Sequence, residues 1–264
     1  DTPMLAGVTA EYRKGLESGV PFPARLAQPA EYAQLVQMIV EHESAKGIYL
    51  NSLGAEYETL EGSYSLSLMF SGHDGDKTSS FNGAGVSTDS LDTPLIELGA
   101  LRQLLSDAEK QIDTIATDGK FVGPVVFTPD CASSMIYELL GNFVTDGVIL
   151  DGTSLWKDKL GQMVADPSLT ISAAPLHPAI VCGERYTSDG RLSEDYDIIK
   201  DGRLNAFALS SYVANKTGHK AAPNSSFSLI VPAGSESIRD IIAGIDRGLL
   251  VSRFSGGSPS SSGD

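Results

Sequence analysis

Three short motifs in the chain could together perform serine acyl transfer. Ser154 and Lys157 fit the pattern SxxK, Ser188-Asp189-Gly190 approximates SDN and Lys216-Thr217-Gly218 fits KTG, in the order that one class of acyl-transfer enzymes uses. In such enzymes the Lys, one helical turn after the Ser, activates the hydroxyl as a nucleophile. However, the KTG segment should occupy a strand, whereas Gly218 is placed to end a helix. We therefore favour Ser154 as a helix N-cap and Lys157 as a solvated charge, with serine catalysis as the alternative.

The histidines do not have the spacing of a zinc site. The chain has four of them: His42, His73, His177 and His219. HExxH-type spacing would place two imidazoles on one helix face, and no pair of these histidines has it. His42-Glu43 begins like such a motif, but no second histidine follows at the required distance. The pattern predicts no zinc ligands and no metal in this chain.

Two other patterns resemble binding loops only in part. Counting from Asp74, an EF-hand would need Gly at the sixth position and Glu at the twelfth, where the chain has Ser79 and Gly85. We therefore interpret this segment as a turn. Gly83 and Gly85 lack the third glycine and the following helix of a dinucleotide-binding loop. No cofactor is expected.

Charge and cysteine content restrict the class of protein. The formal net charge is −15, which repels nucleic acid phosphates, and no apolar run is long enough to span a membrane. Glu194, Asp195 and Asp197 are interpreted as a solvated strand edge, although an acid and base pair in a cleft is the alternative. Cys131 and Cys182 form no disulfide framework, so we expect buried free thiols and a reducing, cytoplasmic location.

The hydrophobic spacing predicts elements of both kinds. Helices are expected at Pro29–Lys46, Asp92–Ile112, Asp130–Phe143, Leu155–Val164, Ser210–Lys216 and Ser235–Arg247. Strands are expected at Ile48–Asn51, Tyr57–Leu60, Ser63–Phe70, Phe81–Val86, Val125–Phe127, Leu169–Ser172, Asp197–Lys200, Leu204–Leu209, Phe227–Val231 and Leu249–Arg253. Because hairpins and helices alternate irregularly, the fold class is α+β, with mixed, largely antiparallel sheets and packed helices.

The order of several segments resembles the TldD/PmbA family, once called modulators of DNA gyrase. The resemblance rests on these segments: NSLGAEYETLEGSYSLSLMF, GKFVGPVVFTPDCASSMIYELL, GTSLWKDKLGQMVADPSLTI, DIIKDGRLNAFALSSYVANKTG and LIVPAGSESIRDIIAGIDRGLLVSRFSGG. It extends from about Ile48 to Asp264. It implies an α+β fold, a cytoplasmic location and a role in proteolysis.

The family resemblance also implies a division of labour between subunits. One subunit holds zinc through a HExxxH helix, and the PmbA-type subunit lacks that motif. The zinc helix would fall at TPDCASSMIYELL, where Asp130, Cys131 and Ser134 cannot supply two His and a Glu. The resemblance therefore implies a zinc-free subunit, without catalytic residues of its own, of a peptidase that cleaves unfolded peptides. The alternative is a binding or structural protein that keeps the fold without a peptidase partner.

The family pattern leads to further expectations about organisation and partners. Residues 1–47 are expected to be a helical remnant of, or link to, an N-terminal domain, and 48–264 a PmbA-like domain that stops before the family's closing strands. The expected partners are a TldD-like zinc subunit, an unfolded peptide and a second copy of this chain, with neither nucleic acid nor membrane. The expected chamber-lining residues are Ser255, Gly256, Gly257, Ser262, Gly263 and Asp264.

Overall fold

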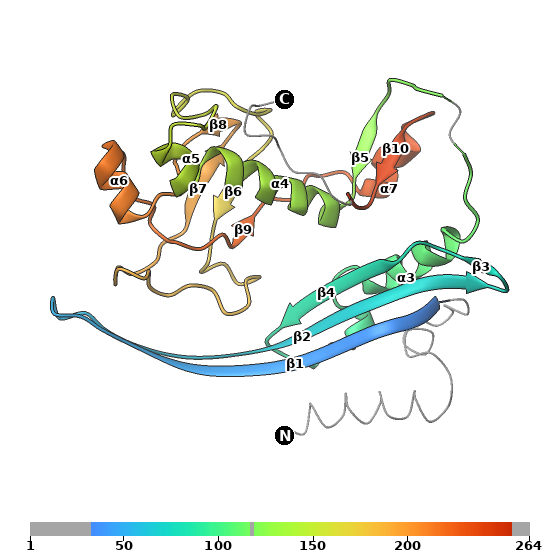
Figure 1. Cartoon of the computed structure of the whole chain (residues 1–264), viewed down its shortest axis with the longest axis horizontal. Helices are drawn as coiled ribbons and strands as arrows, with labels where there is room; N and C mark the ends of the chain where they lie inside the picture. Colours follow the sequence, from blue (N-terminus) through green and yellow to red (C-terminus); the bar gives the residue numbers. More distant parts are fainter. Residues whose placement is uncertain (1–32, 117–118, 255–264) are drawn as a thin grey trace. The chain divides into compact units, whose positions relative to one another are not determined.

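The computed structural model describes residues 33–116 and 119–254. These residues form two compact units, one built from residues 33–49 and 56–116 and the other from residues 50–55 and 119–254. Strands and helices occur in both units, and most strand pairs are antiparallel (Figure 1). The expected α+β class with largely antiparallel sheets is confirmed. No helix among the described residues is long and apolar enough to cross a membrane.

The first unit is built on a long hairpin. Strands β1 (Ala33–Leu50) and β2 (Glu56–Asp74) are neighbours in its sheet, and the short β3 (Lys77–Thr78) and β4 (Asn82–Thr88) each pair with β2. The Asn51 side chain closes the hairpin by accepting hydrogen bonds from the backbone N–H groups of Leu53 and Ala55. The strands that we expected at Tyr57–Leu60 and Ser63–Phe70 are one continuous strand, because β2 runs through Glu61 and Gly62.

The predicted helix at Pro29–Lys46 is wrong for residues 33–46, which belong to β1. Met38 and Val40 pack against the core of the sheet, while Ile39 between them lies exposed on the other face. Because Ile39 is also apolar, it conceals the two-residue period of a strand and imitates a helical stripe. Residues 29–32 lie outside the described part of the chain. The boundary expected after Gly47 falls inside this continuous strand.

The core of the first unit lies between β2 and one helix. Leu66, Leu68 and Phe70 point into the core, and Ser67 and Met69 alternate with them on the exposed face, as the sequence predicted. These side chains pack against a helix, α3 (Leu101–Lys110), which buries three residues: Leu101, Leu105 and Ala108.

The helix that the sequence predicts over Asp92–Ile112 is interrupted. A short 3-10 helix, η1 (Leu95–Glu97), precedes Gly99, whose backbone φ of 55° lies in the left-handed region. A right-handed helix cannot continue through that conformation, so α3 starts only at Leu101. The apolar stripe of the sequence is shared between two elements.

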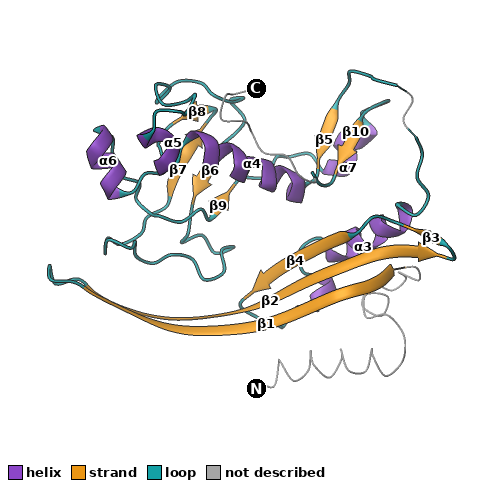
Figure 2. Ribbon diagram, viewed as in Figure 1, coloured by secondary structure: helices purple, strands orange, loops and turns teal. Residues whose placement is uncertain are grey.

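The second unit contains a four-stranded sheet and a separate pair of strands (Figure 2). The sheet has the order β8 (Arg203–Leu204), β7 (Tyr196–Lys200), β6 (Ile171–Ala173), β9 (Leu229–Ile230), and its neighbours are antiparallel. The pair consists of β5 (Val125–Phe127) and β10 (Leu249–Val251), which run parallel. The helices are α4 (Pro129–Phe143), α5 (Asp146–Leu150), α6 (Ser211–Thr217) and α7 (Ile238–Ala243).

Helix α4 supplies one side of the core in this unit. Its start is fixed by Thr128, whose side chain accepts a hydrogen bond from the backbone N–H of Cys131. Near its end, Leu140 and Val144 are fully buried in one cluster with Ile171, Ile198 and other strand residues. The core thus places the end of α4 against β6 and β7.

Several element predictions in this unit need correction. The expected helix at Leu155–Val164 is absent and the chain there forms turns. Trp156 is instead buried against Phe143, with ring centroids 4.7 Å apart, so tertiary packing overrides the local helical pattern. Helix α5 was not predicted, and α7 is shorter than the expected Ser235–Arg247.

The hairpin between β7 and β8 turns at Asp201 and Gly202. Asp201 and Gly202 have φ values of 47° and 74°, the pair of positive angles that a two-residue type I′ turn requires. The Gly202 carbonyl accepts hydrogen bonds from the backbone N–H groups of Val164 and Ala165. A Cβ at Gly202 would lie 2.5 Å from the Ala165 carbonyl oxygen and 2.7 Å from that of Asp166.

We expect Gly202→Ala to lower the free energy of unfolding by about 2–5 kcal/mol, because it combines a left-handed conformation with overlap against backbone atoms. The matched control is Gly218→Ala, because Gly218 has a φ of 76° and nothing lies within 4 Å of its added Cβ. The control should lose only about 1–2 kcal/mol. Chemical unfolding monitored by circular dichroism compares them, and equal losses would contradict the close approach at Gly202.

Candidate functional site

A cavity of about 420 Å³ in the second unit is lined by segments that are distant in sequence. Its walls come from residues 145–146 after α4, residues 187–191, residues 208–212 at the start of α6, and residues 224–227, with Tyr196 of β7. The lining residues include several with hydroxyl groups, two aspartates and three aromatic rings. The cavity volume is within the range of pockets that hold small ligands or parts of larger ones.

Residues 187–191 form a tight turn that is held by hydrogen bonds among its own backbone and side-chain groups. The Gly190 N–H donates to the Thr187 carbonyl at 2.9 Å, and Gly190 itself has a φ of 82°. The Arg191 N–H donates to the Thr187 hydroxyl oxygen at 3.0 Å. Thr187 is only 1% exposed, so the turn is anchored by a buried polar side chain.

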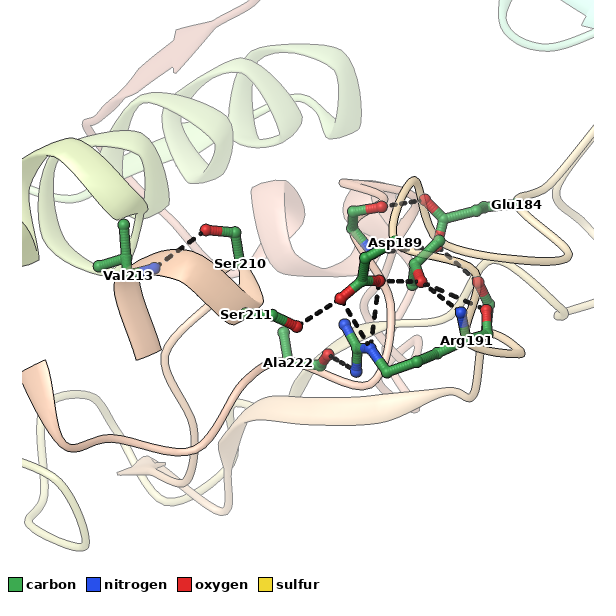
Figure 3. A network of polar contacts seen from close by, with 10 residues as sticks. Glu184, Asp189, Arg191, Ser210, Ser211, Val213 and Ala222 are labelled. Carbon is green, nitrogen blue, oxygen red and sulfur yellow. Dashed lines mark hydrogen bonds and ion pairs between the residues drawn. The ribbon is translucent and has the colours of Figure 1, made fainter. Parts of the chain in front are cut away.

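Asp189 is the centre of a polar network that joins this turn to α6 (Figure 3). Its carboxylate accepts hydrogen bonds from the Ser211 hydroxyl, the Thr187 hydroxyl and the Arg191 Nε. These donors favour the ionised form, so they lower the pKa of Asp189 from 3.8 to about 2, with the Ser211 hydrogen bond as the largest cause. Asp189 is therefore a fixed negative charge at neutral pH.

Arg191 extends this network, and Glu184 is the centre of a second group of hydrogen bonds (Figure 3). Arg191 donates from Nη1 to the carbonyl of Ala222 at 2.9 Å. The Glu184 carboxylate accepts from the hydroxyls of Ser193 and Ser225 and from the Ser225 backbone N–H. The carboxylates thus hold the loops around the cavity through hydroxyl donors.

Asp146 holds the start of α6 through a hydrogen bond to its N-cap residue. Its Oδ1 accepts a hydrogen bond from the Ser210 backbone N–H at 2.9 Å. Ser210 is in turn the N-cap of α6 and accepts from the Val213 N–H. Consecutive residues, Ser210 and Ser211, therefore contact the two carboxylates of the cavity, Asp146 and Asp189.

Tyr196 contributes an aromatic wall that stays protonated. Burial, and to a lesser degree the negative charge of Glu184, raise the pKa of the Tyr196 phenol above its usual range. Its ring and those of Tyr212 and Phe227 line the cavity. The hydroxyl of Tyr137, from α4, donates to the Phe227 carbonyl at 2.7 Å and fixes that part of the wall.

The three motifs of the acyl-transfer alternative do not assemble a nucleophile. The Ser154 hydroxyl is buried, donates to the Phe143 carbonyl at 2.6 Å and accepts from the Trp156 N–H. Lys157 Nζ donates to the Gly152 carbonyl at 3.0 Å and makes no contact with that hydroxyl. Ser154 therefore caps a turn, although the helix that we expected after it is absent.

The other two motifs have separate roles. Ser188 and Asp189 line the cavity, which the sequence alone did not indicate for them. Lys216-Thr217-Gly218 ends α6, with Gly218 as the left-handed C-cap, as the spacing predicted. The Lys216 ammonium lies 5.4 Å from the centre of the Tyr212 ring.

Each histidine has its own local contact. His42 packs on Tyr64, His73 Nε2 lies 2.9 Å from the Ser71 hydroxyl, His177 accepts from a backbone N–H, and His219 meets Phe207 edge to face. Among the residues that the structure describes, no group of three or more His, Cys, Asp or Glu side chains could hold a metal ion. Asp74 lies at the end of β2, beside the turn that the sequence predicted.

Helix α4 does not offer a zinc site at the position that the family resemblance indicates. Cys131 is buried at 2% exposure, and the Ser134 hydroxyl donates to the Asp130 carbonyl. The candidate donors on the helix are Asp130, Cys131 and Glu138, and none of them is one turn from another. Asp130 and Glu138 are eight residues apart, a rise of about 12 Å, which is too far for one ion. These residues do not fit zinc.

The remaining candidates have structural contacts or lie outside the described residues. Asp195 accepts from the Leu176 N–H, and Asp197 accepts from the Ser172 hydroxyl and pairs with Lys200 at 3.1 Å. Two residues of the expected solvated strand edge, Asp195 and Asp197, therefore accept hydrogen bonds within the fold. The expected chamber-lining residues at 255–264 lie outside the described range. Cys131 is buried as expected, but Cys182 is exposed.

Comparison with known proteins links the second unit to one family. The sequence model of the PmbA/TldA metallopeptidase C-terminal domain matches residues 119–264. The chain is 34% identical to metalloprotease PmbA of Escherichia coli O157:H7 over 98 residues, which are 37% of this chain and 22% of that protein. It is 46% identical to 3-hydroxyacyl-CoA dehydrogenase type-2 of Rattus norvegicus over 54 residues. This stretch covers 20% of the chain and 21% of the dehydrogenase, too little to assign a family.

A solved structure shows the same fold. The crystal structure of TldE from Thermococcus kodakarensis superimposes with a TM-score of 0.74 at 18% identity, covering 88% of this chain and 56% of that one. At this identity the likeness establishes the fold. The chain spans just over half the length of this solved structure, and the matched stretches span about a fifth of the curated relatives.

The depressed pKa of Asp189 predicts how stability depends on pH. Because the carboxyl has an ordinary pKa of 3.8 when unfolded and about 2 when folded, its stabilising contribution is complete above about pH 4 and lost as pH falls toward 2. Asp189→Asn should be less stable than the wild type at neutral pH, and the difference should shrink over that acid interval. Asp158→Asn, the same change on an exposed turn, is the control. A constant difference across pH would contradict the network.

Ser154→Ala tests the structural role of this hydroxyl. Removing it leaves the Phe143 carbonyl and the Trp156 N–H without that partner, so the free energy of unfolding should fall by about 1–3 kcal/mol. Ser188→Ala, at an exposed position, should change it little. A fluorophosphonate probe followed by intact-mass measurement should give no adduct on Ser154, and such an adduct would restore the serine-enzyme interpretation.

Proposed function

The chain belongs to the PmbA/TldA metallopeptidase family, the TldD/PmbA group that its motifs indicate, and on that basis we propose that it is a zinc-free subunit of a peptidase assembly. In this role it contributes to handling unfolded peptide, while a TldD-like partner subunit supplies the zinc chemistry. The setting proposed for the assembly is the cytoplasm. The alternative function is a binding or structural protein without a peptidase partner.

One observation carries the proposal, the composition of α4. A peptide bond is cleaved in metallopeptidases by a water that a bound metal activates, with a carboxylate as base. Helix α4 instead has a buried thiol at Cys131 and a hydroxyl at Ser134 that is bonded to its own backbone. A hydrolytic centre on this helix is therefore not available to the chain alone.

Two features of the second unit support a role in peptide binding. Strand β9 is the outer strand of its sheet and pairs only with β6 among the described strands. An edge strand can receive an extended peptide through backbone hydrogen bonds, which bind without regard to sequence. The cavity segment 224–227 leads directly into β9, so a peptide added to this edge would run toward the cavity.

The proposal predicts the result of a mixing experiment. Alone, the chain should not cleave an unstructured peptide, because it lacks an activated water. Mixed with the zinc-bearing homologue of the same organism, it should increase that protein's turnover, and a chelator should abolish the activity of the mixture.

Heat-denatured chain is the control for non-specific effects, and elemental analysis of the purified chain should find no stoichiometric zinc. Chelator-sensitive cleavage by the chain alone would overturn the assignment. No effect on the homologue's turnover would favour the binding-protein alternative.

A further inference from the structure

Two serine hydroxyls in the cavity of the second unit present hydrogen-bond acceptors rather than donors. The hydroxyl of Ser211 donates a hydrogen bond to the Asp189 carboxylate, and that of Ser225 donates to the Glu184 carboxylate. A hydroxyl that donates to a carboxylate retains oxygen lone pairs, which can only accept. A ligand group that complements these two oxygens must therefore donate hydrogen bonds.

Asp146 adds a negative charge and one carboxylate oxygen that can accept a further hydrogen bond. Its Oδ1 accepts from the Ser210 N–H at 2.9 Å, and no hydrogen bond from the described residues reaches its Oδ2. The carboxylate of Asp189, by contrast, already receives two hydroxyls and the Arg191 Nε. With two carboxylates and one guanidinium in the lining, the cavity has a net negative charge that attracts a cation.

The donors that could receive an anion are largely committed. Arg191 directs Nε to Asp189 and Nη1 to the Ala222 carbonyl. At the start of α6, Ser210 caps the Val213 N–H, and Asp146 accepts the N–H of Ser210. A phosphate or carboxylate ligand would meet the negative charges of Asp146 and Asp189, with these donors already engaged.

The aromatic wall also suits a cation. An ammonium group above an aromatic face is attracted by the negative charge of the ring face. Tyr212, which lines the cavity, already has the Lys216 ammonium 5.4 Å from its ring centre. Tyr196 and Phe227 offer further rings to the alkyl part of a ligand.

We propose that this cavity binds a primary ammonium group, with Asp146 as its counter-charge and the hydroxyl oxygens of Ser211 and Ser225 as acceptors. An alkylammonium carries three N–H donors that these acceptors can receive. Two sources have this chemistry, the amino terminus of a peptide and the side chain of a lysine. The peptide origin rests on the proposed function, whereas the ammonium chemistry rests on the cavity alone.

Calorimetric titration of the purified chain tests the proposal without a partner subunit. The probes are a short lysine-free peptide with a free amino terminus, the same peptide N-acetylated, and an N-acetylated version that carries one lysine. We expect at least one ammonium-bearing peptide to bind and the acetylated lysine-free peptide to bind about tenfold more weakly or not at all. Higher salt should weaken the binding.

The pH dependence distinguishes the two sources. An α-ammonium loses its charge at a pKa of about 8 and a lysine side chain at about 10.4. Binding that disappears as pH rises through about 8 identifies the peptide terminus as the ligand, and binding that persists to about 10 identifies lysine. Either outcome supports an ammonium site.

A matched pair of variants locates the site. Asp146→Asn keeps an oxygen for the Ser210 N–H but removes the charge, so it should weaken binding about tenfold. Asp151→Asn makes the same change at the other end of α5, outside the cavity, and should bind like the wild type. Circular dichroism checks that both variants fold.

Equal binding of the acetylated lysine-free peptide, no binding of any peptide, or an unchanged affinity of Asp146→Asn would each overturn the proposal. These results are separate from those of the peptidase experiment. Ammonium binding without any effect on a zinc-bearing homologue would leave the site standing and reject the proposed function.

Discussion

The burial of the end of α4 against strands β6 and β7 is the contact on which the second unit depends. Leu140 and Val144 are fully buried there, and the Val144 carbonyl accepts the Ala208 N–H at 2.9 Å. This bond holds residues 145–146 beside the segment that starts α6. The apolar contact therefore brings Asp146 to Ser210, and a polar cavity wall follows from hydrophobic packing.

Around that wall, the carboxylates accept hydrogen bonds mainly from hydroxyl groups rather than from cationic side chains. Asp189 accepts hydrogen bonds from the hydroxyls of Thr187 and Ser211, and Glu184 accepts them from the hydroxyls of Ser193 and Ser225. Such bonds to ionised groups are stronger than neutral ones and fix the rotation of each hydroxyl. The hydrogen bonds that stabilise the loops therefore also fix the direction of the lone pairs on the hydroxyl oxygens. In this way the fold of the loops determines which ligand groups the cavity can bind.

The family membership and the composition of α4 both bear on the proposed role. Helix α4 follows a Thr cap and has a Pro at its start, and its residues include a buried thiol and a hydroxyl that donates to the helix backbone. These side chains do not form a set of zinc ligands. They support the proposal that another chain supplies the metal chemistry.

The sequence by itself determined the features that depend on neighbouring residues. The Asp201-Gly202 turn, the capped ends of α4 and α6, and the alternation of Leu66, Leu68 and Phe70 in β2 all follow from local rules of backbone angle and side-chain period. The irregular alternation of hairpins and helices indicated the α+β fold, and the family resemblance implied the same fold.

Tertiary structure decided the features that depend on a partner distant in the chain. Residues 33–46 form a strand because β2 lies beside them, and the expected helix after Ser154 gives way because Trp156 is buried against Phe143. The cavity combines Asp146, Asp189 and Ser225, whose separation in sequence exceeds 30 residues at each step, so no local pattern could indicate it. Long-range burial and hydrogen bonding, which local spacing does not encode, produce that assembly.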